Sequence, residues 1–126
     1  MKNMDFKIFC LGNEFIKEDS LAKKVGEELG DKFDVFMIKD SFQLMEGLSG
    51  KFAKEGEEII VLDVVENLNN VRLLDVEDLR VDSILSAHDF DAGFVLKLLR
   101  GRNIKIIGIP QSGDFYEIVR QVKKTL

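Results

Sequence analysis

Residues 6–29 of the chain, FKIFCLGNEFIKEDSLAKKVGEEL, contain the pattern from which the fold can be predicted. The apolar run at 6–11, broken by a single lysine, is typical of a strand that is covered on both faces. Gly12 and Asn13 then favour a sharp turn, because both residue types tolerate positive φ. Apolar residues recur every fourth position over 21–29, which predicts an amphipathic helix. The stretch therefore predicts a strand–loop–helix unit, in which functional groups tend to follow the carboxyl end of the strand.

The same alternation of apolar runs and helical stripes continues along the rest of the chain. The predicted strands are residues 6–11, 33–38, 59–65 and 104–109, with an edge strand at 71–76. The run at 59–65, IIVLDVV, is the most apolar and is typical of a central parallel strand. This order predicts an α/β fold, a three-layer α/β/α sandwich with a mainly parallel, twisted sheet. Right-handed crossovers then bring the ends of the parallel strands to one edge of the sheet.

Length and composition limit the classes of function. A chain of 126 residues is long enough for one domain with its own core, so residues 1–126 are expected to form a single domain. The net charge of −5 and the absence of any long Lys/Arg cluster argue against nucleic acid as a partner. The apolar runs are strand-sized, which argues against membrane insertion, and the polar start of the chain does not resemble a secretion signal. With one cysteine there is no disulfide framework, and we expect a monomer in the reducing cytoplasm.

Three residues are candidate metal ligands and candidate catalytic residues. Asp19 follows the first predicted strand, Asp63 lies near the end of the most apolar run, and His88 precedes a predicted helix. Two carboxylates and an imidazole are suitable ligands for a divalent metal ion in an open site. Structural explanations also exist: Asp63 could accept a backbone hydrogen bond, and a single histidine in a loop is often incidental. A carboxylate inside so apolar a run is nevertheless costly without a purpose.

Four blocks of the sequence resemble those of a known family. They are residues 12–19 (GNEFIKED), the strand that ends at Asp63, residues 86–88 (SAH) before a helix, and residues 106–111 (IIGIPQ). In their order they resemble the signatures of the nickel–iron hydrogenase maturation endopeptidases. The metal-contacting positions of that family fall on Asp19, Asp63 and His88.

Some positions depart from the family pattern. Cys10 stands where the family has the first glycine of its Gly-x-Gly-Asn signature, and Ser20 and Ala22 replace the small glycine-type residues that follow the acids. Gln111 stands in place of an acid in the last block, and the C-terminal segment is shorter than in most of the family. These departures bear on the choice of substrate.

The resemblance implies an unusual proteolytic reaction. Such an enzyme removes the C-terminal extension of a hydrogenase large-subunit precursor after nickel has been inserted. Asp19, Asp63 and His88 would then contact nickel that the substrate carries, and we expect no tightly bound resident metal. The precursor is the implied partner. A set of at most three ligands without a thiolate is expected to bind a metal ion weakly by itself.

Two other classes of protein share the predicted fold. A receiver-like signalling domain has an aspartate at the end of its third strand, but it also needs an acidic pair at the end of the first strand and a lysine before the last proline. Here the acids at 18–19 come about six residues after Gly12, and Ile109 precedes Pro110. A nucleotide-binding domain would need a glycine-rich loop followed by a lysine, which is lacking. A non-catalytic binding domain remains an alternative.

Overall fold

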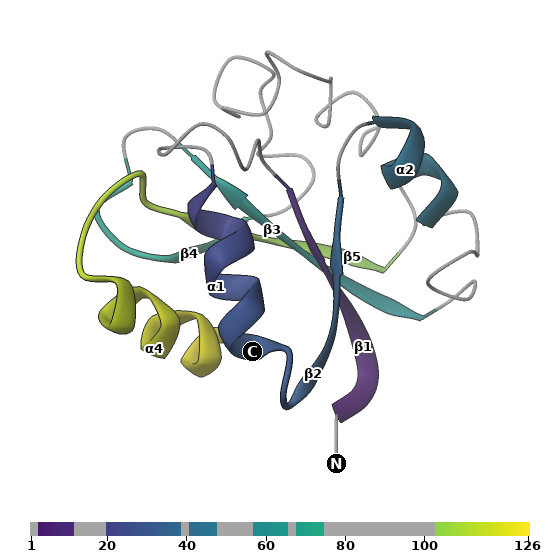
Figure 1. Cartoon of the computed structure of the whole chain (residues 1–126), viewed down its shortest axis with the longest axis horizontal. Coiled ribbons are helices and arrows are strands. Elements are labelled where there is room, and N and C mark those ends of the chain that lie inside the picture. The colour runs from purple at the N-terminus through teal and green to yellow at the C-terminus, as the bar shows by residue number, and fades with distance from the viewer. Residues whose placement is uncertain (1–2, 12–19, 39–40, 48–56, 66–67, 75–102) are drawn as a thin grey trace.

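The computed structural model describes residues 3–11, 20–38, 41–47, 57–65, 68–74 and 103–126, which have an α/β fold (Figure 1). In chain order the elements are β1 (Asn3–Cys10), α1 (Leu21–Leu29), β2 (Phe33–Met37), α2 (Ser41–Glu46), β3 (Glu58–Val64), β4 (Arg72–Leu74), β5 (Ile104–Ile109) and α4 (Phe115–Thr125). The strands predicted from apolar runs are therefore confirmed, with shifts of one to three residues at some ends.

The strands form one five-stranded sheet in the order β2-β1-β3-β5-β4. β1, β2, β3 and β5 run parallel, and β4 pairs antiparallel with β5. The predicted central position of β3 is confirmed, and this strand is buried over almost its whole length. The predicted edge strand is also confirmed, although it is shorter than expected. The sheet is mainly parallel, as the alternation of strands and helices predicted.

The parallel strands end together at one edge of the sheet, which we call the carboxyl edge. Backbone hydrogen bonds continue just past the strand ends there. The N–H of Leu11 donates to the carbonyl of Leu62 at 2.9 Å, and the N–H of Val65 donates to the carbonyl of Ile109 at 2.9 Å. The prediction that the first, third and last strands end at the same edge is thus confirmed.

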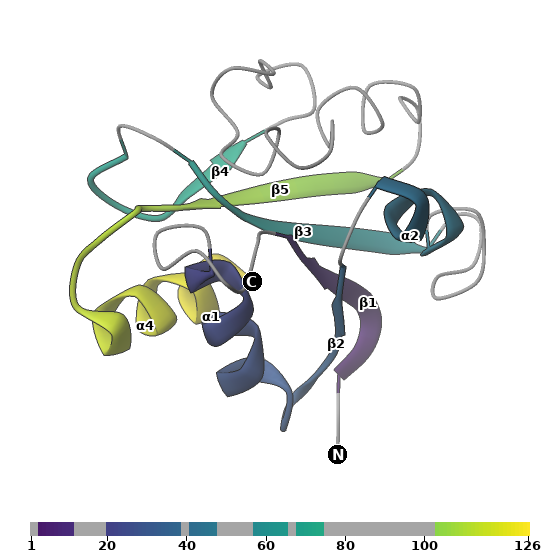
Figure 2. The same ribbon diagram turned by 45° about the horizontal axis from the view of Figure 1, so that its top comes forward.

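α1 and α4 cover one face of the sheet, which we call the α1/α4 face (Figure 2). Their buried apolar residues are Ala22, Val25 and Leu29 in α1 and Ile118, Val119 and Val122 in α4. These stripes repeat every three to four residues, as expected for helices packed on a sheet. Asp114 caps α4 by accepting a hydrogen bond from the N–H of Glu117 at 3.1 Å. No helix among the described residues has the length and apolarity needed to cross a membrane.

A second core cluster lies on the opposite face of the sheet. It contains alternate residues of the strands, such as Phe9, Val61 and Ile106, together with Leu44 of α2. A sheet with an apolar cluster on each face explains why the strands are continuous apolar runs in the sequence. The third layer of the predicted sandwich stays a prediction, because residues 48–56 and 75–102 lie outside the described part of the chain.

Candidate functional site

Asp63 is the one acidic residue that is buried among those the structure describes. It lies near the carboxyl end of β3, and only 2% of it is exposed. Because successive side chains of a strand point to opposite faces, Asp63 lies on the same face as Ile59 and Val61, opposite the α1/α4 face. The expectation of a carboxylate within the most apolar strand is confirmed, and its burial is nearly complete.

Apolar side chains pack against the strand next to Asp63. In the register of β3 with β5, Asp63 is opposite Gly108. A Cβ atom at Gly108 would lie 2.8 Å from Cδ1 of Leu68, 3.2 Å from Cδ1 of Leu74 and 3.3 Å from Cγ2 of Val65. The glycine therefore leaves the space into which these side chains pack. The result is a closely packed apolar cover on the strand next to the carboxylate.

The strand order places Asp63 at the usual position of a ligand site in such sheets. From β1 the chain passes through α1 to β2 on one side, whereas β3 and β5 lie on the other side. Open α/β sheets bind ligands outside the carboxyl ends of the strands where the order reverses, here between β1 and β3. Asp63 is near the end of one of these two strands.

The other two predicted site residues, Asp19 and His88, lie outside the described residues. Asp19 directly precedes Ser20, the N-cap residue of α1. Among the residues that the structure describes, no group of three or more His, Cys, Asp and Glu could hold a metal ion, and that set includes neither Asp19 nor His88. The convergence of Asp19, Asp63 and His88 therefore stays a prediction.

Cys10 packs in the core and is not available for catalysis. Its side chain is fully buried at the end of β1, and burial raises the pKa of its thiol to about 12, although the charge of Lys23 acts in the opposite direction. A Cβ atom at Gly26 of α1 would collide with Sγ of Cys10, so the helix approaches the strand closely here. A thiol that stays protonated at neutral pH is a poor nucleophile and a poor metal ligand.

A cluster of charges that sequence reasoning missed lies farther from the carboxyl edge, on the same face as Asp63. Nζ of Lys7 donates a hydrogen bond to Oε2 of Glu57 at 3.0 Å and is 3.4 Å from Oδ2 of Asp34. The hydrogen bond that Lys7 donates to Glu57 raises the pKa of Lys7 most, burial lowers this pKa, and Asp34 raises it further. Glu57 and Asp34 are 50 and 27 positions from Lys7 in the sequence, so no local pattern could reveal the cluster.

The chain matches no protein-family model, and no curated protein is similar to it. Among solved structures, it is similar to an uncharacterized protein from Wolinella succinogenes, with a TM-score of 0.55 and 21% sequence identity. This similarity covers 85% of this chain and 74% of that chain. At so low an identity the likeness supports the α/β fold alone.

Proposed function

We propose that the protein is an endopeptidase that removes the C-terminal extension of a nickel-loaded hydrogenase large-subunit precursor. The observation that carries this proposal is the carboxylate of Asp63, 2% exposed near the carboxyl end of the central strand. Asp63 belongs to the second block of the resemblance to the hydrogenase maturation endopeptidases, and Gly108, opposite it in the sheet, belongs to the fourth. Two blocks that are distant in the sequence are thus neighbours in the fold.

The chemistry of the three residues suits contact with nickel that the substrate carries. Asp19, Asp63 and His88 together would offer carboxylate and imidazole ligands, while softer ligands would come from the precursor. The nickel then identifies a precursor that is ready for processing. The reaction would take place in the cytoplasm, with the enzyme as a monomer.

The thiol of Cys10 is excluded as the nucleophile in this proposal. Its pKa of about 12 keeps it protonated, and its side chain is fully buried. With the thiol excluded, the proposed nucleophile is water, and the carbonyl of the scissile bond is the electrophile. The proposed role of Asp63 is to hold the substrate's metal centre at a fixed position on the carboxyl edge, beside the side chains that pack over Gly108.

No specific observation favours the alternative of a receiver-like domain. Flavodoxin-like domains, the fold class of receivers, have the strand order 2-1-3-4-5. The parallel strands β2-β1-β3-β5 follow the start of this order, so the strand order does not separate the two classes. The sequence does, because Ile109 precedes Pro110 where a receiver has a lysine. A non-catalytic binding domain of the same fold is the remaining alternative, and an assay of proteolysis distinguishes it.

The proposal is tested by incubating the purified protein with a nickel-loaded precursor and following the release of the C-terminal peptide by mass spectrometry. We expect the wild type to cleave, and His88→Ala to lose cleavage by at least about a hundredfold because one contact to the nickel is lost. Asp31→Asn is the matched control, because Asp31 is exposed after α1, and it should cleave normally. Absence of cleavage by the wild type, or normal cleavage by a folded His88→Ala variant, would contradict the proposal.

A further inference from the structure

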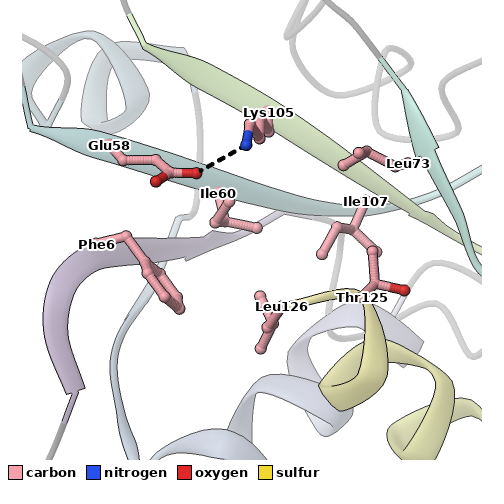
Figure 3. A pocket seen from close by; sticks show the side chains of 8 residues that line it. All are labelled: Phe6, Glu58, Ile60, Leu73, Lys105, Ile107, Thr125 and Leu126. Atoms are coloured by element: carbon pink, nitrogen blue, oxygen red, sulfur yellow. Dashed lines mark ion pairs between the residues drawn. The ribbon is translucent and has the colours of Figure 1, made fainter.

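A pocket lies at the other end of the sheet from Asp63, on the α1/α4 face (Figure 3). Its volume is about 200 Å³, and it is formed by β1, β3, β4, β5 and the C-terminal end of α4. Asp63 belongs to the opposite face and to the carboxyl edge. The pocket is therefore separate from the candidate nickel site, and what it binds does not depend on the proposed proteolysis.

The floor of the pocket is apolar and belongs to the core of the fold. Phe6, Ile60 and Ile107 come from three neighbouring strands and are 8%, 5% and 1% exposed. Figure 3 shows these side chains on the side of the sheet that faces the end of α4, with Leu126 across from them. Since the sheet fixes the three floor residues, the apolar surface is present before any ligand arrives.

Two opposite charges lie beside this apolar floor. Oε1 of Glu58 and Nζ of Lys105 are 3.4 Å apart across β3 and β5 (Figure 3). Their side chains are 30% and 50% exposed, so the pair is solvated and contributes little to stability. Both charges are accessible to a molecule that enters the pocket.

We propose that this pocket binds a free α-amino acid with a large aliphatic side chain, such as leucine. The carboxylate of the ligand would meet Lys105, its ammonium group would meet Glu58, and its side chain would cover Ile60 and Ile107. In an α-amino acid the two charges are joined through a single carbon, so they lie about as close together as Glu58 and Lys105 do. A ligand with only one charge would face repulsion from one member of the pair.

The size of the pocket supports this ligand class. Pockets for drug-sized molecules have volumes of roughly 300–1,000 Å³, and this one has about 200 Å³. A molecule of amino-acid size fits that volume, whereas a nucleotide does not. Among the described residues that line the pocket, Glu58 and Lys105 have the ionisable side chains. A ligand with several charges would leave most of them without partners.

The first test is a titration of the ¹⁵N-labelled protein followed by NMR. We expect saturable shifts of the backbone amides of Ile60 and Ile107 with L-leucine, with a dissociation constant of about 0.1–1 mM. 4-Methylpentanoate, which lacks the ammonium group, isoamylamine, which lacks the carboxylate, and glycine, which lacks the side chain, should each bind at least about tenfold more weakly. No saturable shift up to about 10 mM L-leucine, or equal binding of 4-methylpentanoate and L-leucine, would overturn the proposal.

The second test uses variants of the two charged residues. Lys105→Gln and Glu58→Gln should each weaken L-leucine binding about tenfold, and Glu58→Gln should also improve the binding of 4-methylpentanoate because a repulsive charge is removed. Both side chains are partly exposed, so the variants are expected to fold. Arg72→Gln is the control, because Arg72 is an exposed cation that does not line the pocket. Unchanged L-leucine binding in both Lys105→Gln and Glu58→Gln would overturn the assignment.

Discussion

Lys7 and Asp63 are both buried on the same face of the sheet, but at different levels along the strands. Lys7 is level with Ile59, near the start of β3, whereas Asp63 is level with Gly108, near the end of β5. The ammonium group of Lys7 has a carboxylate at 3.0 Å and another at 3.4 Å. Around Asp63, apolar side chains pack over the neighbouring Gly108, and Asp63 also has an interaction of its own.

We expect the two buried charges to have different roles, because they lie towards opposite ends of the parallel strands. Around Lys7, ion pairs join β1 to β2 and to Glu57, just before β3, and we expect this cluster to have a structural role. Asp63 lies at the carboxyl edge, next to the position where open α/β sheets bind ligands. We therefore expect substitutions near Lys7 to change stability and substitutions near Asp63 to change activity.

The largest expected effect is that of Asp63→Asn on proteolysis. An amide is a much weaker ligand than a carboxylate, so kcat/KM for a nickel-loaded precursor should fall about a thousandfold. The side chains have nearly the same shape, and circular dichroism should show a folded protein. Near-normal cleavage by the folded variant would contradict a functional role for Asp63, and so its difference from Lys7.

Lys7→Met should lower stability and leave cleavage unchanged, the opposite of what we expect for Asp63→Asn. Removing the cation leaves Asp34 and Glu57 close together without it, which should lower the free energy of unfolding by about 1–3 kcal/mol. Cleavage by the folded fraction should stay normal. Lys24→Met is the matched control, because Lys24 is exposed on α1, and denaturant unfolding should show little change for it. A large loss of cleavage in a stable Lys7→Met protein would show that the cluster is functional.

The stabilising effect of Lys7 should also depend on pH in a defined direction. The folded-state pKa of Lys7 is raised above 10.5, so its contribution to stability is complete below about that pH and is lost as pH rises through the higher folded value. The difference in melting temperature between the wild type and Lys7→Met should therefore persist at neutral and mildly alkaline pH and shrink above pH 10.5. A difference that grows over this alkaline range would contradict the assigned ion pairs.

Two glycines allow a finer separation of stability from activity. Gly108→Ala should push Leu68 and Leu74 away from the strand beside Asp63, and we expect cleavage to fall about fivefold. The loss of stability should be modest, because the ends of these two side chains can move. Gly26→Ala would press on Sγ of Cys10 on the α1/α4 face, which should lower stability by about 1–3 kcal/mol without changing cleavage. Thermal unfolding of both variants measures the change in stability, and kcat/KM measures the change in cleavage. Equal effects on cleavage would count against a special role for the surroundings of Asp63.

The sheet was largely predictable from the sequence, because a strand buried on both faces is a continuous apolar run. The run at 59–65 indicated both the central strand and its buried carboxylate. The antiparallel direction of β4 was not predictable, since Arg72–Leu74 is only three residues long and mostly exposed. The same holds for its place beside β5, which depends on pairing between segments more than 30 positions apart.

The contacts within the site and the pocket were not predictable, because they join residues from separate strands. The glycine of IIGIPQ was noted as part of a motif, but only the strand register shows that Gly108 is opposite Asp63. The ion pair of Glu58 and Lys105 joins β3 to β5. Each residue is a charge near the start of its own strand, and neither local sequence indicates that the two strands are neighbours. The joining of Asp19 and His88 to Asp63 stays a prediction, since both lie outside the described residues.

The most direct test of the account measures whether Asp63 and the substrate's nickel act together. A precursor with a non-cleavable extension is prepared with and without nickel, and its affinity for the wild type and for Asp63→Asn is measured. We predict that nickel tightens binding to the wild type by at least about tenfold and has little effect on binding to Asp63→Asn. An equal effect of nickel on both proteins, or no effect on either, would contradict the claim that Asp63 contacts the metal of the substrate.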